Sequence, residues 1–315
     1  MARRIIIDCD PGQDDAVALL LAFASPDELE VVGITTVGGN VPLELTQRNA
    51  RMICDIANST VPVYAGCDKP MARPLRTAEY IHGKTGIDGF DVFEPESPLQ
   101  QEHAVDFIVE TLRMADDASV TLVPTGPLTN LGTAIKREPG ILPKIDQIVL
   151  MGGAMREGGN RTPSAEFNIL VDPEAADIVF RCGRPITQIG LDVTHQVLST
   201  QERVDRVRAL NNPVAIAVAG MLGFFERFDM EKYASKGAPL HDPCTVAYLL
   251  RPNLFEGKVC NVAVETQSEL TLGHTAVDFW HVTDRPRNVN WIHAVDADGF
   301  YDLLLERLAR FGGSI

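Results

Sequence analysis

Short apolar runs rich in valine and isoleucine recur through residues 1–200 of the chain. Each run is nearly continuous in hydrophobicity, which is typical of strands buried on both faces of a parallel sheet. We therefore predict strands at 4–7, 29–37, 61–64, 120–123, 147–151 and 186–191.

The segments between these strands have the length and apolar spacing of amphipathic or buried helices. The predicted helices are 14–24, 43–57, 103–115, 129–136 and 173–182. Strands that alternate with helices form βαβ units with right-handed crossovers. The pattern thus indicates an α/β protein with an open, largely parallel sheet and helices on both faces.

Beyond residue 196 the pattern becomes more helical. A strand pair is expected at 259–266 and 275–282, around a polar turn that contains Gly273. No repeat and no long Pro/Gly-rich linker marks a domain boundary, so a length of 315 residues leaves one or two domains open. The helices predicted here are 201–210, 213–228, 243–250 and 302–311.

Composition excludes several classes of protein. With 43 acidic and 28 basic residues, the formal charge of −15 offers no basic face for nucleic acid. The apolar stretches 16–24 and 214–225 are too short to span a bilayer. The apolar run after Arg4 is only three residues long and predicts no signal peptide, so we expect a cytoplasmic protein without membrane partners. Six scattered cysteines, with no Cys-x-x-Cys pair, suggest no redox or zinc role.

Polar and glycine residues follow the predicted strands, where ligands bind in open α/β sheets. Asp8-Cys9-Asp10-Pro11-Gly12-Gln13-Asp14-Asp15 follows the first strand, and Gly38-Gly39-Asn40 follows the second. Thr125-Gly126-Pro127 follows the strand at 120–123, and Gly152-Gly153 opens a polar loop that reaches Asn160. These segments are the candidates for an active site at the carboxyl ends of the strands.

Four carboxylates within eight residues repel one another unless a cation or a helix dipole compensates. Asp14 and Asp15 could simply benefit from the helix that they open, but Asp8 and Asp10 precede it. Oxygen ligands without histidine or cysteine suit Ca²⁺ or Mg²⁺ rather than zinc. The segment therefore predicts a site for a hard divalent cation.

Two further segments have both a structural and a functional interpretation. Asp242-Pro243 opens an apolar helical run, so a role as helix N-cap alone would explain Asp242. Asp172-Pro173 repeats this pattern, and there we interpret Asp172 as an N-cap only. Glu166 and Asn168 flank an apolar residue, which in extended chain places both on one face and suits hydroxyl recognition. Exposed polar alternation is the alternative.

Two histidines are candidate catalytic groups, although a lone histidine usually has a structural role. His241 precedes Asp242 directly. His82 lies in the glycine-dense segment 81–89, which we expect to be mobile enough to act as a lid.

The chain resembles the inosine-uridine preferring nucleoside hydrolases over nearly its whole length. The resemblance implies one Rossmann-like domain over residues 1–315, one Ca²⁺ per subunit, and a homodimer or homotetramer. It is carried by Asp8-Cys9-Asp10-Pro11-Gly12-Gln13-Asp14-Asp15-Ala16, Pro124-Thr125-Gly126-Pro127-Leu128-Thr129-Asn130, Met151-Gly152-Gly153, Ala165-Glu166-Phe167-Asn168 and His241-Asp242-Pro243.

By the same resemblance, the reaction is hydrolysis of the N-glycosidic bond of ribonucleosides to base and ribose. Asp10 would be the general base, and His241 or, through the lid, His82 would protonate the leaving base. The carboxylates of Asp10, Asp15 and Asp242 and the backbone carbonyl of Thr125 would bind the ion. Residues implied in binding the ribose are Asp14, Asn40, Asn160, Glu166 and Asn168, with His241 also at the substrate.

Two other functions stay open from the sequence. One is a Ca²⁺-dependent nucleoside-binding protein without turnover. The other is a phosphatase of the haloacid-dehalogenase type with Asp8 as nucleophile, Asp10 as acid and Mg²⁺, although Gly12 stands where that motif expects Thr or Val. The preference between purine and pyrimidine also stays open; it is expected to depend on segment 222–240, with Phe224, Phe225, Phe228, Met230 and Tyr233 as candidate walls.

Overall fold

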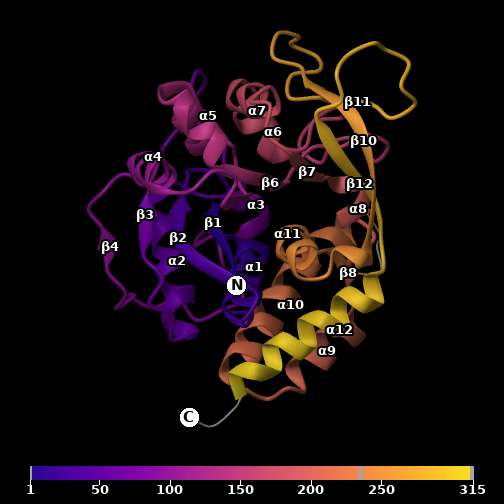
Figure 1. Cartoon of the computed structure of the whole chain (residues 1–315). Helices are drawn as coiled ribbons and strands as arrows, with labels where there is room; N and C mark the ends of the chain where they lie inside the picture. Colours follow the sequence, from indigo (N-terminus) through magenta and orange to yellow (C-terminus); the bar gives the residue numbers. More distant parts are fainter. Residues whose placement is uncertain (1, 234–236, 313–315) are drawn as a thin grey trace.

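A ten-stranded sheet runs through the computed structural model (Figure 1). The structure describes residues 2–233 and 237–312, except for the side chains of 225–233. Its strand order is β11-β10-β12-β7-β6-β5-β1-β2-β3-β4. Strands from β12 to β4 are parallel, and β10 and β11 add an antiparallel edge. The strands are β1 (Arg3–Cys9), β2 (Leu29–Thr36), β3 (Val63–Ala65), β4 (Leu99–Gln100), β5 (Val120–Pro124), β6 (Ile145–Met151), β7 (Ile186–Ile189), β10 (Phe255–Val264), β11 (Thr275–Asp278) and β12 (Val289–Val295), with β8 (Leu198–Ser199) and β9 (Ala238–Pro239) in a separate pair.

Helices connect the strands and cover the sheet. None of the helices in the described ranges is both long and apolar enough to cross a membrane. They are α1 (Gln13–Phe23), α2 (Leu43–Ile56), α3 (Glu79–His82), α4 (Ala104–Met114), α5 (Thr129–Arg137), α6 (Phe167–Val171), α7 (Pro173–Phe180), α8 (Leu191–Thr194), α9 (Gln201–Arg208), α10 (Pro213–Tyr233), α11 (Pro243–Leu250) and α12 (Ala297–Leu308).

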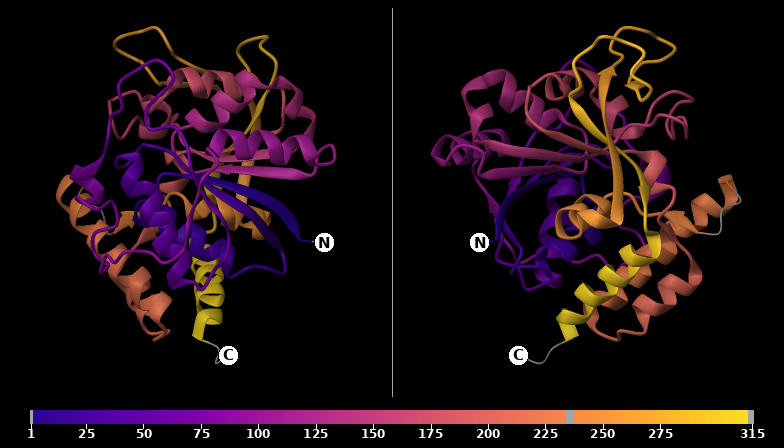
Figure 2. Two further views of the ribbon diagram at one scale, coloured as in Figure 1. Left: turned by 90° about the vertical axis from the view of Figure 1, so that its left-hand side faces the viewer. Right: turned by 45° about the vertical axis from the view of Figure 1, so that its right-hand side comes forward.

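Alternating side chains of the strands point into two separate cores. Ile5 and Ile7 of β1 belong to the core formed with α1, α2 and α9 to α12, and Ile6 belongs to the core formed with α4, α5 and α7. Figure 2 shows these helices on the two sides of the sheet. Burial on both faces explains why the central strands are almost uniformly apolar in sequence.

The order of the strands reverses between β1 and β5. From β1 the chain moves outward through β2, β3 and β4, and then returns to β5 beside β1 and moves outward in the other direction through β6 and β7. The carboxyl ends of β1 and β5 therefore flank a topological switch point, where open α/β sheets bind their ligands.

The predicted α/β fold with a largely parallel sheet is confirmed, and the expected strand pair is the hairpin of β10 and β11. One long strand, β12, was missed; it pairs with β7 and β10 and joins the C-terminal part of the chain to the central sheet. The last helix begins at Ala297 rather than at 302, because Asp296 caps it by accepting the N–H of Gly299 at 3.0 Å.

Candidate active site

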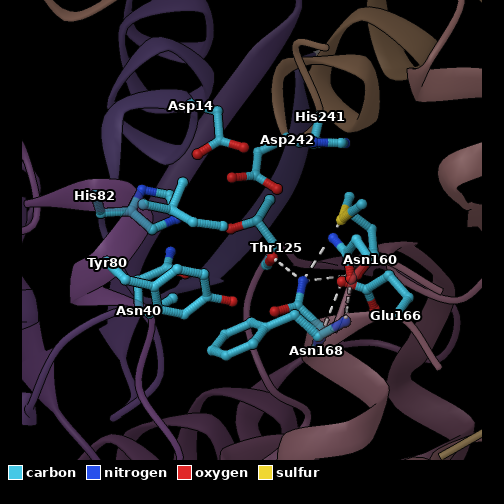
Figure 3. Close-up of a pocket in the computed structure, with 14 residues that line it drawn as sticks. Asp14, Asn40, Tyr80, His82, Thr125, Asn160, Glu166, Asn168, His241 and Asp242 are labelled. Carbon is cyan, nitrogen blue, oxygen red and sulfur yellow. Dashed lines mark hydrogen bonds between the residues drawn. The ribbon is translucent and has the colours of Figure 1, made fainter. Parts of the chain in front are cut away.

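A pocket of about 530 Å³ opens at the switch point (Figure 3). Of the predicted site residues, Asp10 and Asp15 lie directly behind its wall, because both hydrogen-bond to the lining residue Asn40. The other nine predicted residues line it: Asp14, Asn40, His82, Thr125, Asn160, Glu166, Asn168, His241 and Asp242.

Three buried carboxylates converge at one side of the pocket. Asp14 and Asp15 lie in the first turn of α1, and Asp242 directly precedes α11. Their carboxylate oxygens lie within 4.8 Å of one another. The cap interpretation of Asp242 is wrong, because its side chain makes no capping hydrogen bond and instead pairs with Asp14. Asp172 does cap α7, accepting the N–H of Ala175 at 3.0 Å.

Hydrogen bonds from the neighbouring loops hold Asp10 and Asp15 in place. Oδ1 of Asp15 accepts the Thr125 hydroxyl at 2.7 Å, and Oδ2 accepts the N–H of Gly12 at 3.0 Å. Oδ2 of Asp10 accepts the N–H of Asn40 at 2.7 Å, whereas its Oδ1 is buried without a hydrogen-bond partner. The loops after β1, β2 and β5 thus meet at these carboxylates.

Burial and mutual repulsion raise the pKa values of the clustered carboxyl groups. Burial raises the pKa of Asp10 well above its ordinary value and raises that of Asp14 to about 7. For both groups the next largest cause is repulsion by the carboxylate of Asp15. Burial, with Asp14 as the next cause, raises the pKa of Asp242 well above its ordinary value. Ionising the whole cluster therefore needs a compensating positive charge.

The donor set suits a hard divalent cation. All candidate ligands are oxygens, and the buried Oδ1 atoms of Asp10 and Asp14 have no hydrogen-bond partner.

Gly39 and Gly126 permit the close packing around Asp10. A Cβ at Gly39 would lie 2.1 Å from Oδ2 of Asp10, and a Cβ at Gly126 would lie 2.4 Å from Oδ1 of Asp10.

Asp8 stands apart from this cluster. Its Oδ1 accepts the Thr35 hydroxyl at 2.6 Å and the Asn130 amide at 2.8 Å, and it does not line the pocket. Burial raises its pKa to about 6. Its observed partners make it a structural carboxylate beneath the site.

Glu166 and Asn168 line the opposite side of the pocket. The extended conformation expected across them is wrong at Asn168, since Glu166 is the N-cap of α6 and Asn168 lies in its first turn. Oε1 of Glu166 accepts the N–H of Asn168 and Oε2 accepts that of Gly153, both at 2.9 Å. The Asn168 amide donates to the Thr125 carbonyl at 2.7 Å, and Asn160 caps the same turn through the N–H of Phe167 at 3.0 Å.

The two candidate histidines contact the pocket from different elements. His82 ends α3, and burial lowers its pKa to about 4. His241 approaches the Thr194 hydroxyl with Nδ1 at 2.8 Å, and burial, with His195 as the next cause, lowers its pKa to about 3. Both rings are therefore neutral near pH 7.

The expected lid segment is anchored to the body of the protein. The amide of Asn49 donates to the carbonyls of Pro11 at 3.0 Å and Thr85 at 2.9 Å, and Gln13 binds the carbonyls of His82 and Asp88. Motion of this segment stays a prediction.

Sequence reasoning missed part of the pocket wall. Tyr80 lies just before the segment 81–89 without a motif of its own, although its place next to this glycine-dense segment could have drawn attention to it. Among the expected walls of the base site, Phe224 packs near Gly89. The other four expected side chains lie outside the described residues: Phe225, Phe228, Met230 and Tyr233.

Together the fold and the pocket define an α/β enzyme whose site of carboxylates, amides and histidines lies at the switch point of its sheet. Residues 5–302 match the family model described as inosine-uridine preferring nucleoside hydrolase. The chain belongs to this family and is an N-glycosyl hydrolase that acts on nucleosides.

Relatives of this family align with the chain from end to end. The pyrimidine-specific ribonucleoside hydrolase RihA of Shewanella sp. strain ANA-3 is 50% identical over 98% of this chain and 97% of its own length. The structure of a purine-preferring ribonucleoside hydrolase from Gardnerella vaginalis is 36% identical, with a TM-score of 0.90 over 99% of this chain and 100% of that one. A plant nucleoside hydrolase structure is 31% identical, with a TM-score of 0.91 over 98% and 99%.

Proposed function

We propose that this enzyme hydrolyses ribonucleosides to free base and ribose in a Ca²⁺-dependent reaction with Asp10 as the general base. The observation that carries the proposal is the buried carboxylate cluster beside a pocket whose far wall presents Glu166 and Asn168. Carboxylates that need a cation lie next to amide and carboxylate groups that suit sugar hydroxyls.

The carboxylates of Asp10, Asp15 and Asp242 and the carbonyl of Thr125 would hold the ion. When bound, Ca²⁺ would raise the acidity of a water molecule and bind the 2′ and 3′ hydroxyls of the ribose. The Asn168 amide supports this assignment, because its 2.7 Å hydrogen bond fixes the direction of the Thr125 carbonyl. Asp14 would lie beside the ion and the ribose hydroxyls.

Asp10 would take the proton from the attacking water. Its Oδ2 is committed to the N–H of Asn40 at 2.7 Å, and Oδ1 remains as the basic atom. Burial raises its pKa, so the positive charge of the proposed ion is what would keep Asp10 ionised and able to accept this proton. Cleavage passes through a cationic, oxocarbenium-like ribosyl group, which the surrounding carboxylates and the amides of Asn160 and Asn168 would stabilise.

Departure of the base requires a proton, for which His241 is the first candidate and His82 the second. His241 directly precedes the proposed ligand Asp242 and lines the pocket. Its ring is neutral near pH 7, so it acts either through its N–H or after it takes up a proton with the substrate in place.

The substrate is an uncharged ribonucleoside rather than a nucleotide, because a phosphate group would be repelled by the carboxylates of this pocket. The relative from Shewanella, named pyrimidine-specific, is more similar in sequence than the structure named purine-preferring. We therefore propose pyrimidine ribonucleosides as the preferred substrates.

The two alternatives lose support from the placement of Asp8 and from the family. A phosphatase of the haloacid-dehalogenase type needs Asp8 as nucleophile, but the Oδ1 of this side chain is held by the Thr35 hydroxyl and the Asn130 amide. A binding protein without turnover would not need the basic atom that Asp10 presents beside the cluster.

The proposal is tested by measuring ribose release from uridine, cytidine, inosine and adenosine before and after removal of metal with a chelator. Turnover is expected to disappear on chelation and to return with Ca²⁺, with the pyrimidine nucleosides cleaved fastest. Full activity after chelation would refute the role of the ion. Release of phosphate from nucleotides without release of ribose would instead support the phosphatase alternative.

We also propose that the chain assembles as a homodimer or homotetramer and works in the cytoplasm, as the family resemblance implies. Light scattering coupled to size-exclusion chromatography measures the mass against 34.4 kDa for one chain. A monomer at micromolar concentration would refute the assembly.

A further inference from the structure

The glycine pair Gly152-Gly153 directly follows β6, and the proposed reaction gives it no role. Gly153 has a φ of 79°, in the left-handed region that favours glycine. A Cβ on Gly153 would lie 2.4 Å from Nε2 of Gln188 and 2.9 Å from Cγ2 of Thr275. Residues 152–154, which we call the glycine turn, are therefore packed closely against side chains of β7 and β11.

Groups from neighbouring elements satisfy the backbone of the glycine turn. The Gln188 amide of β7 donates to the carbonyl of Gly152 at 2.9 Å. The N–H of Gly153 donates to Oε2 of Glu166, and the carbonyl of Gly153 accepts the N–H of Leu191, both at 2.9 Å. The first two residues of the turn are thus bound to β7, to α8 and to the N-cap of α6.

The third residue of the turn, Ala154, is bound by one hydroxyl from β11. Oγ1 of Thr275 accepts the N–H of Ala154 at 3.0 Å and donates to the carbonyl of the same residue at 2.7 Å. Thr275 is 1% exposed and Ala154 is 2% exposed, so water has little access to these groups. Loss of the hydroxyl would therefore leave a buried donor and a buried acceptor without their partner.

The glycine turn contacts the side of the pocket that is proposed to bind the ribose. Glu166 accepts the N–H of Gly153 through Oε2 and that of Asn168 through Oε1. The Asn168 amide donates to the carbonyl of Met151, the residue before the turn, at 3.3 Å. Glu166 and Asn168 both line the pocket (Figure 3). A displacement of the turn would therefore move hydrogen-bond partners of both side chains.

We propose that Thr275 is a positioning residue: its hydroxyl fixes the glycine turn and thereby keeps Glu166 and Asn168 in place for the sugar of the nucleoside. The sugar as the ligand rests on the proposed function, whereas the effect of Thr275 on the turn does not. By this proposal the antiparallel hairpin of β10 and β11, at the edge of the sheet, contributes to a pocket at the centre of the sheet.

The chain offers a matched set of variants. Thr275→Val removes the hydroxyl and nearly keeps the shape of the side chain, and Thr275→Ser keeps the hydroxyl. Thr121→Val is the control, because Thr121 is also a buried strand threonine, in β5, and its hydroxyl donates to Asp146 at 3.4 Å. If Thr275 only stabilises the fold, both valine variants lower the Tm and neither changes the kinetics of the folded enzyme.

The first readout is amide hydrogen exchange without substrate, resolved at Gly153, Ala154 and Asn168 and measured well below the Tm of every variant. We expect all three amides to exchange about fivefold faster or more in Thr275→Val, and at the parent rate in Thr275→Ser and Thr121→Val. Unchanged exchange in Thr275→Val would overturn the effect on the turn. A change at Ala154 alone would show a local bond and would also overturn the proposal.

The second readout is kcat/KM for uridine with saturating Ca²⁺. We expect a loss of about tenfold or more in Thr275→Val, and values near that of the parent enzyme in Thr275→Ser and Thr121→Val. A parent value of kcat/KM in Thr275→Val, or an equal loss in Thr121→Val, would overturn the role at the sugar.

Thr275→Ser keeps the proposal falsifiable if Thr275→Val does not fold. Serine can make both hydrogen bonds to Ala154, so a folded Thr275→Ser protein that exchanges faster at Gly153 and Asn168, or loses tenfold in kcat/KM, would overturn the proposal. Hydrogen exchange is independent of turnover. Failure of the parent protein to release ribose would therefore refute the proposed function and leave the effect of Thr275 on the turn intact.

Discussion

The Asp10→Asn variant separates catalysis from structure most sharply. An asparagine can turn its Oδ1 to the N–H of Asn40 and keep the 2.7 Å hydrogen bond, while its amide nitrogen takes the place of the unpartnered oxygen. The side chain keeps its size but loses the basic atom. Loss of a general base lowers kcat by about 10²- to 10⁴-fold, which corresponds to about 3–5 kcal/mol in the activation barrier.

Stability and ion binding are expected to change far less. The kept hydrogen bond and one fewer carboxyl in a crowded cluster leave the free energy of unfolding within about 1 kcal/mol of the parent value. The assay is ribose release from uridine under saturating Ca²⁺, together with calorimetric titration of Ca²⁺ and urea unfolding. Asp8→Asn is the matched control, since Asp8 is also a buried carboxylate at the end of β1, but its Oδ1 is held by Thr35 and Asn130.

The reasoning is refuted if Asp10→Asn turns over as fast as Asp8→Asn. It is also refuted if turnover is lost only in proportion to bound Ca²⁺ and returns when the site is filled, because the proposed ligand role of Asp10 would then account for the loss without a role as the base.

Three further predictions concern the leaving base, a helix cap and pH. His241→Ala should slow uridine much more than a riboside with a good leaving group such as p-nitrophenol, and equal losses on both substrates would argue against an acid role. Asp172→Ala should lower the free energy of unfolding by about 1–3 kcal/mol in urea titrations, because the N–H of Ala175 loses its cap, with kcat unchanged. Since burial raises the pKa of Asp14 to about 7, the folded state binds its proton more tightly than the unfolded state, and this contribution to stability is lost as pH rises through about 7. The Tm of calcium-free protein should therefore fall from pH 5 to pH 8, and Ca²⁺ should oppose the fall; a Tm that rises over this range would contradict the argument.

The central sheet and the candidate site were accessible from the sequence because they depend on local patterns. Apolar runs as continuous as that of β1 occur where both faces are covered, and the polar residues that end these runs lie at one edge of the sheet. Nine of the predicted side chains therefore line one pocket although they come from distant parts of the chain.

The features that the sequence did not predict depend on contacts between distant segments, which no local pattern encodes. In β12, Asn290 and His293 interrupt the apolar residues around Trp291, and this strand is stabilised by pairing with β10 and with β7, which lies far earlier in the chain. Glu166 is an uncommon N-cap, so the helical turn after it could not be anticipated from capping preferences. Thr275 acquires its proposed role only from the turn that it contacts, 121 residues earlier in the chain.

The switch point also has a consequence for synthesis on the ribosome. Asp10 and Asp15 emerge early, Thr125 near the middle and Asp242 in the last quarter of the chain, because the site draws on both halves of the sheet. If the proposed Ca²⁺ site exists, a nascent chain that has not yet produced α11 would hold an incomplete set of ligands and could not capture the ion as the finished enzyme would. Stabilisation by the ion would then be reserved for full-length chains, and prematurely terminated products would be left without it and open to proteolysis.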